Sequence, residues 1–214
     1  MPYLRDTVFV LSKSPFREQD RAYIVYGREH GLLYAVARSA SSKKSKQAPH
    51  LEPLTVSHIM IAKGATFDKL AVAHAEPRSW YAHTHPRLAH YAIALGFTGL
   101  AQKLLYPGVA DENIFNLFCE LCEITGNLPQ EPSLERSRFI FSAATVKLLD
   151  MLGYAPAPHP AYPVIAFMQR SPLRDCLRIT ATTHELDRAS SFVDEALTHT
   201  PLQDDSASKH MILF

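Results

Sequence analysis

The 214-residue chain lacks the features that mark membrane and secreted proteins. Its apolar runs fall short of the roughly 18 residues that a membrane span needs, and its first residues are charged and alternating, unlike a secretory leader. Three cysteines are too few for a disulfide framework in a chain of this size, and an odd count suits a reducing compartment. These absences predict a cytoplasmic protein with no membrane partner.

Signatures of catalysis are also scarce. With only 8 glycines, phosphate-cradling loops are poorly supplied, and the chain has no nucleophile elbow or kinase signature. The best case for an enzyme is the run HTHPRLAH, where His83, His85 and His90 offer imidazoles to a catalytic metal. Pro86 starts a helix directly after this pair, and no carboxylate-rich motif accompanies it. A metal-dependent hydrolase is therefore the minor alternative, and no catalytic residue or cofactor is predicted.

Charge is divided unevenly along the chain. The net charge is only +1, but residues 1–80 hold 12 Lys and Arg against 7 Asp and Glu, while residues 81–214 hold 10 against 14. A basic half is typical of a protein that meets phosphates. The acidic half is better suited to protein partners.

Hydrophobic periodicity changes at the same place. Up to about Ala75 the chain alternates as short strands, with Gly31 and Gly64 placed for turns. The predicted strands are TVFVLS, RAYIVYG, GLLYAVARS, LTVSHIMIA and FDKLAVAHA. Five short strands separated by turns fit a small barrel.

After Trp80 the apolar residues follow the helical period. The predicted stripes are Leu88, Ala92, Leu95 and Gly99 behind Pro86; Ile114, Phe118, Leu121 and Cys122 behind a capping Asp111; and Phe141, Thr145, Leu148, Leu149 and Leu152 in a helix from about Ser133 to Leu152. Gly126 and Gly153 are placed to end the second and third helices. A last helix is predicted from Glu185 to His199.

Together these patterns predict an α+β fold of two domains, a five-stranded barrel over residues 1–80 and a mainly helical domain over residues 81–214. Four prolines between Tyr154 and Pro163 predict an ordered, irregular connector near residues 154–163.

The segment VARSASSKKSKQAPH, from Val36 to His50, places a mobile and basic loop between two predicted strands. Its cations are Arg38, Lys43, Lys44 and Lys46, spaced to present separate charges instead of one helix face. Solvation alone would explain a single charged loop equally well. Further cations of the same half fall at strand ends or turns, so several can converge on one side of the barrel: Lys13, Arg17, Arg21 and Arg28.

Three tyrosines at strand spacing, Tyr23, Tyr26 and Tyr34, either fill the core or lie exposed beside these cations. Exposed rings would stack on bases while the cations follow the phosphate backbone, as in proteins that bind single-stranded nucleic acid.

The ordered set of these features resembles the N-terminal domain of the bacterial RecO recombination mediators. In that family a strand and a short acidic loop precede the next strand, and a Gly-Leu pair leads into a basic Ala-Arg loop and then Leu-x-Pro. The matching residues are Glu18, Gly31, Leu32, Ala37, Arg38, Ala40, Lys43, Lys44, Leu51 and Pro53. LLDMLGYAP is similar to a helix end of the family's second domain, so the likeness spans residues 3 to about 156.

The resemblance implies an oligonucleotide-binding (OB) barrel followed by a helical domain, without catalytic chemistry. Such proteins bind single- and double-stranded DNA, anneal complementary strands and, with RecR, help load RecA onto DNA coated by single-stranded DNA-binding protein. The DNA surface implied here comprises Arg38, Lys43, Lys44, Lys46, Arg17 and Arg21. The acidic tail of single-stranded DNA-binding protein docks on the helical domain, where the available cations are Arg136, Arg138 and Lys147. An RNA-binding barrel module is the other alternative.

The chain departs from the family in its cysteines. Many relatives carry two Cys-x-x-Cys pairs of a zinc site after the LGY helix, but here PAPHPAYP follows and the next cysteine is Cys176. Cys119 and Cys122 form a Cys-x-x-Cys inside a predicted helix, where the spacing puts two small apolar side chains on one face. Core thiols are favoured over a metal site, and no metal is predicted.

Overall fold

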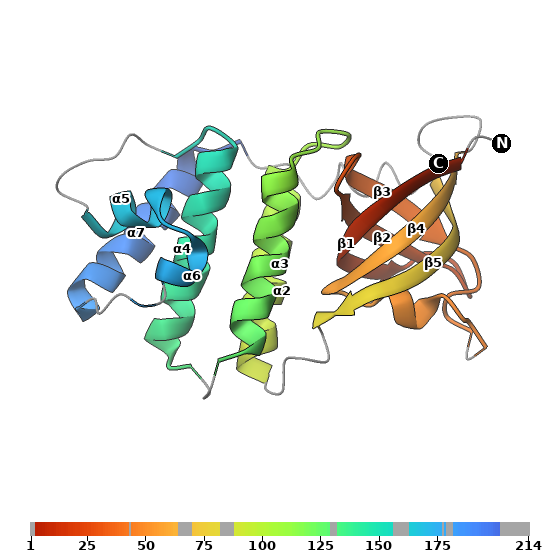
Figure 1. The fold of residues 1–214 in the computed structure, drawn as a ribbon, viewed down its shortest axis with the longest axis horizontal. Coiled ribbons are helices and arrows are strands. Elements are labelled where there is room, and N and C mark those ends of the chain that lie inside the picture. The colour runs from red at the N-terminus through yellow and green to blue at the C-terminus, as the bar shows by residue number, and fades with distance from the viewer. Residues whose placement is uncertain are drawn as a thin grey trace.

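The computed structural model places the strands at one end of an elongated molecule and the helices at the other (Figure 1). It describes residues 3–42, 44–63, 70–81, 88–128, 132–155, 163–176, 178 and 182–201. Among these residues no helix has both the length and the apolar character needed to cross a membrane.

Five strands form a closed barrel in the order β1-β2-β3-β5-β4. They are β1 (Tyr3–Pro15), β2 (Arg21–Gly27), β3 (Gly31–Ala37), β4 (Thr55–Lys63) and β5 (Leu70–Trp80). All neighbours are antiparallel except β3 and β5, which pair in parallel at Val36 and Ala71. This closed five-stranded order is that of the OB fold, so the predicted barrel is confirmed.

Burial on both faces of β1 explains its continuous apolar run. Val8 and Val10 belong to the cluster inside the barrel, whereas Phe9 and Leu11 belong to a second cluster shared with the helices. Strand β2 divides in the same way, with Tyr23 inside and Tyr26 outside. Consecutive strand residues point to opposite faces of the barrel wall. The outward-pointing residues of β1 and β2 are buried because helices cover this side of the barrel.

Six helices follow the barrel in the described part of the chain. They are α2 (Leu88–Leu104), α3 (Glu112–Gly126), α4 (Leu134–Met151), α5 (Pro163–Arg170), α6 (Leu173–Cys176) and α7 (Thr183–His199), and a 3-10 turn, η1 (Ala48–Leu51), lies between β3 and β4. Figure 1 shows α2 and α3 next to the barrel and the other helices beyond them. The fold is therefore α+β, as predicted.

Side-chain caps explain where three helices begin. Asp111 accepts a hydrogen bond from Asn113 N, as predicted for the start of α3. Ser133 accepts one from Arg136 N at the start of α4. Thr182 and Glu185 form a reciprocal capping box, so α7 begins at Thr183, two residues before the predicted start at Glu185.

The predicted buried face of α2 is wrong. Leu88 is 80% exposed, and Ala92 and Gly99 are also exposed. The buried stripe lies on the other side of the helix and comprises His90, Ile93, Ala94, Phe97, Thr98, Ala101 and Leu104. This stripe is the one that is buried, because burial of Ile93, Phe97 and Leu104 removes more apolar area from water than burial of the opposite face with its small residues would.

The proline-rich connector is only partly described. Pro163 is not irregular but is the first residue of α5, where its missing N–H costs no hydrogen bond. Residues 156–162 lie outside the described part of the chain, as do Gly64 and Pro86. Gly153 adopts φ +77° directly after α4, as expected of a glycine that ends a helix.

The β2–β3 side of the barrel is fastened to the loop between α2 and α3. The Tyr26 hydroxyl accepts a hydrogen bond from Asp111 N at 2.9 Å. Gly31 has φ +65°, and a Cβ there would lie 2.1 Å from the carbonyl oxygen of Val109. The rings of Phe9 and Tyr26 meet Phe118 of α3 at centroid distances of 5.2 and 5.7 Å. The outer wall of the barrel and the helices thus share one hydrophobic cluster, separate from the cluster inside the barrel.

Candidate nucleic-acid interface

Strand pairing brings two connecting segments to the same end of the barrel. Arg21 begins β2 opposite Pro15, the last residue of β1, and also opposite Ala37, the last residue of β3. The β1–β2 loop and the segment that leaves β3 therefore lie next to each other.

Two hydrogen bonds join these segments directly. Ser41 N donates to Gln19 O at 2.9 Å, and Ser39 N donates to the Asp20 carboxylate at 2.9 Å. Ser39 has φ +53°, a left-handed conformation that non-glycine residues adopt at a cost. The hydrogen bond that Ser39 N donates to Asp20 holds Ser39 at the point where the chain turns out of β3.

The segment after β3 is not the loose loop that its composition predicts. Ser42 N and Ser45 N donate to backbone carbonyls three residues earlier, and the Gln47 amide donates to Ala73 O of β5 at 3.0 Å. The segment then enters η1. Consecutive turns, tied to both the β1–β2 loop and β5, give the described residues of this segment a defined path.

Five of the six predicted DNA-binding cations lie at this end of the barrel, which we name the basic end: Arg17, Arg21, Arg38, Lys44 and Lys46. All are exposed except Arg21, which is half-buried. Within the described residues none of the five forms an ion pair, so their charges are available to phosphates. Glu18 and Asp20 are the acidic residues of the β1–β2 loop. The sixth predicted cation, Lys43, lies outside the described residues.

Two other cations of the barrel have structural partners instead. Lys13 forms an ion pair with Glu52. Arg28 follows β2 at the opposite end of the barrel, where its guanidinium lies 3.4 Å from Glu112 and 4.8 Å from the centre of the Phe115 ring in α3. The expectation that Arg28 joins a common cationic surface is wrong, because the β2–β3 turn faces the helices.

Two of the three candidate stacking tyrosines are core residues. Tyr23 is 2% exposed inside the barrel and Tyr26 is fully buried beneath α3. Burial is the main cause that raises the pKa of Tyr23 to about 12. Tyr34 is half-buried and packs against the helical core from β3.

An aromatic residue that the sequence reasoning passed over lies at the basic end. Phe16 is in the β1–β2 loop, and the Arg17 guanidinium lies 5.2 Å from the centre of its ring. Its signal in the sequence is an aromatic residue between Pro15 and Arg17, in a turn where polar residues are usual.

The histidine alternative receives no support from the described residues. His90 is 1% exposed and belongs to the buried stripe of α2, while His83 and His85 lie outside the described residues. In the described part of the chain no group of three or more His, Cys, Asp or Glu side chains is arranged to hold a metal ion.

The Cys-x-x-Cys pair lies in the core, as favoured. Cys122 is 1% exposed within the helical cluster, and Cys119 packs against that cluster. Burial raises the pKa of Cys119 to about 11 and that of Cys122 well above its ordinary value. Both thiols are therefore protonated at neutral pH and are poor metal ligands.

The three candidate cations of the helical half do not converge. Arg136 and Lys147 lie on one side of α4, because eleven residues bring a helix back to within roughly 20°. The Arg136 guanidinium lies 5.6 Å from the centre of the Phe139 ring, and burial lowers its pKa. Arg138, two positions on, lines a different surface.

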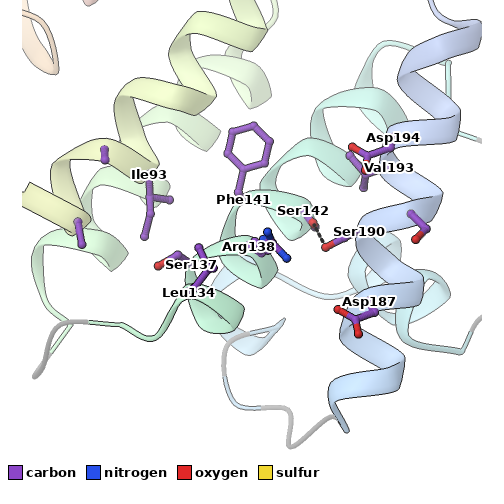
Figure 2. Close-up of a pocket in the computed structure, with 13 residues that line it drawn as sticks. Ile93, Leu134, Ser137, Arg138, Phe141, Ser142, Asp187, Ser190, Val193 and Asp194 are labelled. Atoms are coloured by element: carbon purple, nitrogen blue, oxygen red, sulfur yellow. Dashed lines mark hydrogen bonds between the residues drawn. The ribbon is translucent and has the colours of Figure 1, made fainter.

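That surface is a groove of about 770 Å³ between α2, α4 and α7. Figure 2 shows Arg138 and Phe141 of α4 near Ile93 of α2, with Asp187 and Asp194 on α7 across the groove. The groove is mainly apolar and carries a single cation among its described lining residues.

Comparison with known proteins agrees with this architecture. Residues 1–76 match the family described as Recombination protein O N terminal. A protein named DNA repair protein RecO from a Synechococcus strain is 28% identical over 165 residues, which cover 74% of this chain and 54% of that protein. The protein of that name from Acaryochloris marina is 29% identical, covering 70% and 49% of the two chains, and that from Rubrobacter xylanophilus is 27% identical, covering 73% and 60%.

The chain spans about half the length of the curated relatives it matches. The family match covers the basic end and the barrel as far as Glu76 in β5, and the alignment with the Synechococcus protein, over 74% of the chain, also takes in part of the helical half. Residues 1–76 are therefore similar to the RecO N-terminal family, and the chain as a whole is similar to proteins named DNA repair protein RecO.

Proposed function

We propose that this chain is a DNA-binding recombination mediator, and that the basic end of the barrel is its DNA surface. The observation that carries the proposal is the pair of hydrogen bonds that joins the β1–β2 loop to the segment after β3. These bonds join the loop that carries Arg17 and leads to Arg21 to the segment that carries Arg38, Lys44 and Lys46, which supports a common surface for these cations. Relatives named DNA repair protein RecO support the same role.

The proposed activity is the annealing of complementary strands without catalytic turnover. Two strands that approach each other repel through their phosphates, and cations that neutralise both backbones lower this cost. Phosphate contacts do not read base sequence, so pairing itself remains with the nucleic acid. We place the protein in the cytoplasm, where it meets chromosomal DNA.

We propose that the helical half carries the protein partners. Its net charge is negative, which disfavours the spread of DNA over it. The α4 side of the groove offers Arg138 and an apolar wall to the acidic tail of single-stranded DNA-binding protein, whereas Asp187 and Asp194 of α7 line the other side and oppose an acidic ligand there. In this proposal the protein, acting with RecR, helps to load RecA onto the coated DNA. The division between the two halves is proposed at about residue 80.

Charge reversal at the basic end tests the DNA surface. If about six phosphates are neutralised, the logarithm of the affinity for a single strand falls against the logarithm of the salt concentration with a slope of about −4. Changing Arg38, Lys43 and Lys44 together to Glu should weaken binding to every DNA sequence and flatten the slope by about 2, because roughly 0.7 is lost per phosphate contact. Fluorescence anisotropy with a labelled oligonucleotide over a salt series measures both quantities.

The matched control reverses three exposed cations of the helical half, Lys103, Arg170 and Arg178, to Glu. This variant has the same net charge as the first but should keep the slope of the unaltered protein. If the first variant binds with unaltered affinity and slope, or if both variants lose affinity equally, the basic end is not the DNA surface. An equal loss of affinity for RNA and DNA strands leaves the surface in place but assigns it to nucleic acid in general.

A further inference from the structure

Phe16 has an environment that the packing of the protein does not explain. It is a large apolar side chain in the β1–β2 loop and is partly exposed. Among the described residues it belongs neither to the cluster inside the barrel nor to the cluster shared with the helices, and it is not among the side chains packed against either. Its ring is therefore not part of the hydrophobic core that stabilises the fold.

The loop nevertheless holds Phe16 in a defined place. Phe16 N donates a hydrogen bond to Asp20 O at 3.3 Å, which closes the loop on itself. Asp20 in turn accepts from Ser39 N, and Gln19 O accepts from Ser41 N. The backbone of Phe16 is thus held in the loop that is joined to the segment carrying Arg38 and Lys44.

The chemistry around the ring is suited to a nucleobase. The Arg17 guanidinium lies over the Phe16 ring at 5.2 Å, so a flat cation and an aromatic face stand together. Unpaired bases stack on aromatic rings and on guanidinium planes whatever their identity, because every base has a π-face. In OB folds the β1–β2 loop is one of the two loops that commonly contact oligonucleotides.

We propose that Phe16, with Arg17, is the base-stacking element of the basic end and gives the protein a preference for single strands over duplex. This inference rests on the proposed function, since it requires DNA at the basic end. In a duplex the base faces are stacked on one another and only the phosphates are within reach of the loop. In a single strand a base is free to leave its neighbours and lie against the Phe16 ring. The cations bind both forms, and the ring binds only one.

Replacement of Phe16 by Leu tests the proposal, because Leu keeps the apolar bulk and loses the aromatic face. Affinity for a single-stranded oligothymidine should fall about five- to thirtyfold, the lower part of the range for one stacked base, because Leu keeps some apolar contact. Affinity for a duplex of the same length should stay within about twofold, and the salt slope should not change, because no phosphate contact is lost. Phe16→Trp should bind the single strand at least as well as the unaltered protein.

Two controls keep the test specific. Tyr106→Leu removes an exposed aromatic ring from the loop after α2. This loop contacts the barrel at Leu32, at the end opposite the basic end, so the substitution should leave all affinities unchanged. An oligonucleotide of abasic sugar phosphates offers charge without bases, so Phe16→Leu should bind it as the unaltered protein does. Thermal unfolding of each full-length variant shows whether the fold is kept.

The outcomes separate this inference from the proposed function. If charge reversal at the basic end flattens the salt slope but Phe16→Leu leaves single-strand affinity unchanged, the DNA surface stands and the stacking role is wrong. If Phe16→Leu weakens single strand, duplex and abasic strand alike, Phe16 supports the loop and does not stack, which also overturns the inference. If neither change affects binding, both proposals fail.

Discussion

Asp6 is a carboxylate buried beneath the turn that joins β2 to β3. Its side chain is inaccessible to solvent, and it accepts hydrogen bonds from Glu29 N at 3.2 Å and His30 N at 3.0 Å, with His30 Nδ1 also at 3.0 Å. Gly27 leaves room for it, since a Cβ there would lie 2.1 Å from the Asp6 carboxylate. One buried side chain therefore takes the place of backbone partners for this turn.

We expect Asp6→Ala to lower the free energy of unfolding by about 1–3 kcal/mol, because it leaves partly buried backbone N–H groups without their acceptor. Gly27→Ala should also destabilise, because its methyl group would displace the same carboxylate. Urea unfolding followed by circular dichroism measures both changes. The control is Glu29→Ala, which removes an exposed side chain from the same turn. An unchanged midpoint for Asp6→Ala would show that water satisfies the turn.

At the scale of elements, the arrangement of the basic end depends on contacts between loops and less on the strands that carry them. Ser39 adopts a strained backbone conformation and its N–H is bonded to Asp20, 19 residues earlier in the chain. Asp20 is acidic, and a negative charge beside DNA weakens binding. An acidic residue at this position is understandable if its acceptor oxygen positions the cations.

Two substitutions of Asp20 separate its charge from its hydrogen bond. Asn and Ala both remove the charge, but only Asn keeps an oxygen acceptor for Ser39 N. We expect Asp20→Ala to bind single-stranded DNA about fivefold more weakly than Asp20→Asn, which corresponds to about 1 kcal/mol for one hydrogen bond. Equal affinities of the two variants, measured by anisotropy at one salt concentration, would mean that Asp20 has no positioning role.

At the scale of the whole molecule, the barrel with its basic end lies at one end and α4 and α7, which line the groove, lie at the other, with α2 and α3 between them (Figure 1). The two surfaces can therefore be altered separately. In the proposed function, bare strands require only the basic end, whereas strands coated by another protein require the groove as well.

Annealing assays with the full chain test this separation. Arg138→Glu should leave the annealing of bare complementary strands unchanged and slow that of strands coated by single-stranded DNA-binding protein about fivefold, as expected for one charge reversed at an exposed contact. Arg170→Glu, on α5, is the matched control and should behave as the unaltered protein in both assays. A parallel loss with bare and coated strands would place Arg138 outside any docking site.

Local signals in the sequence are sufficient for most of the fold. Alternation predicts all five strands, Asp111 predicts the cap of α3, and the helical period predicts that α4 starts near Ser133. These patterns depend only on neighbouring residues. The buried face of α2 depends instead on which stripe meets the barrel and α4, and both faces carry apolar or small residues. Local periodicity cannot make that choice.

The same limit applies to the candidate interface. The cations of the β3–β4 segment are evident from composition, but their union with Arg17 and Arg21 depends on strand pairing and on Asp20. Arg28 is equally basic and equally close to a turn, yet α3 covers it. Tyr26 is excluded from stacking because helices lie over the outer wall of the barrel.

The shared wall between the barrel and α2–α3 has a consequence for any shortened version of this protein. Phe9, Tyr26, Leu32, Leu54 and Val56 are barrel side chains shielded from water by helices that come later in the chain. A barrel truncated after β5 would expose this apolar surface to solvent and would tend to self-associate. Its nucleic-acid binding would then describe clustered fragments instead of the native protein.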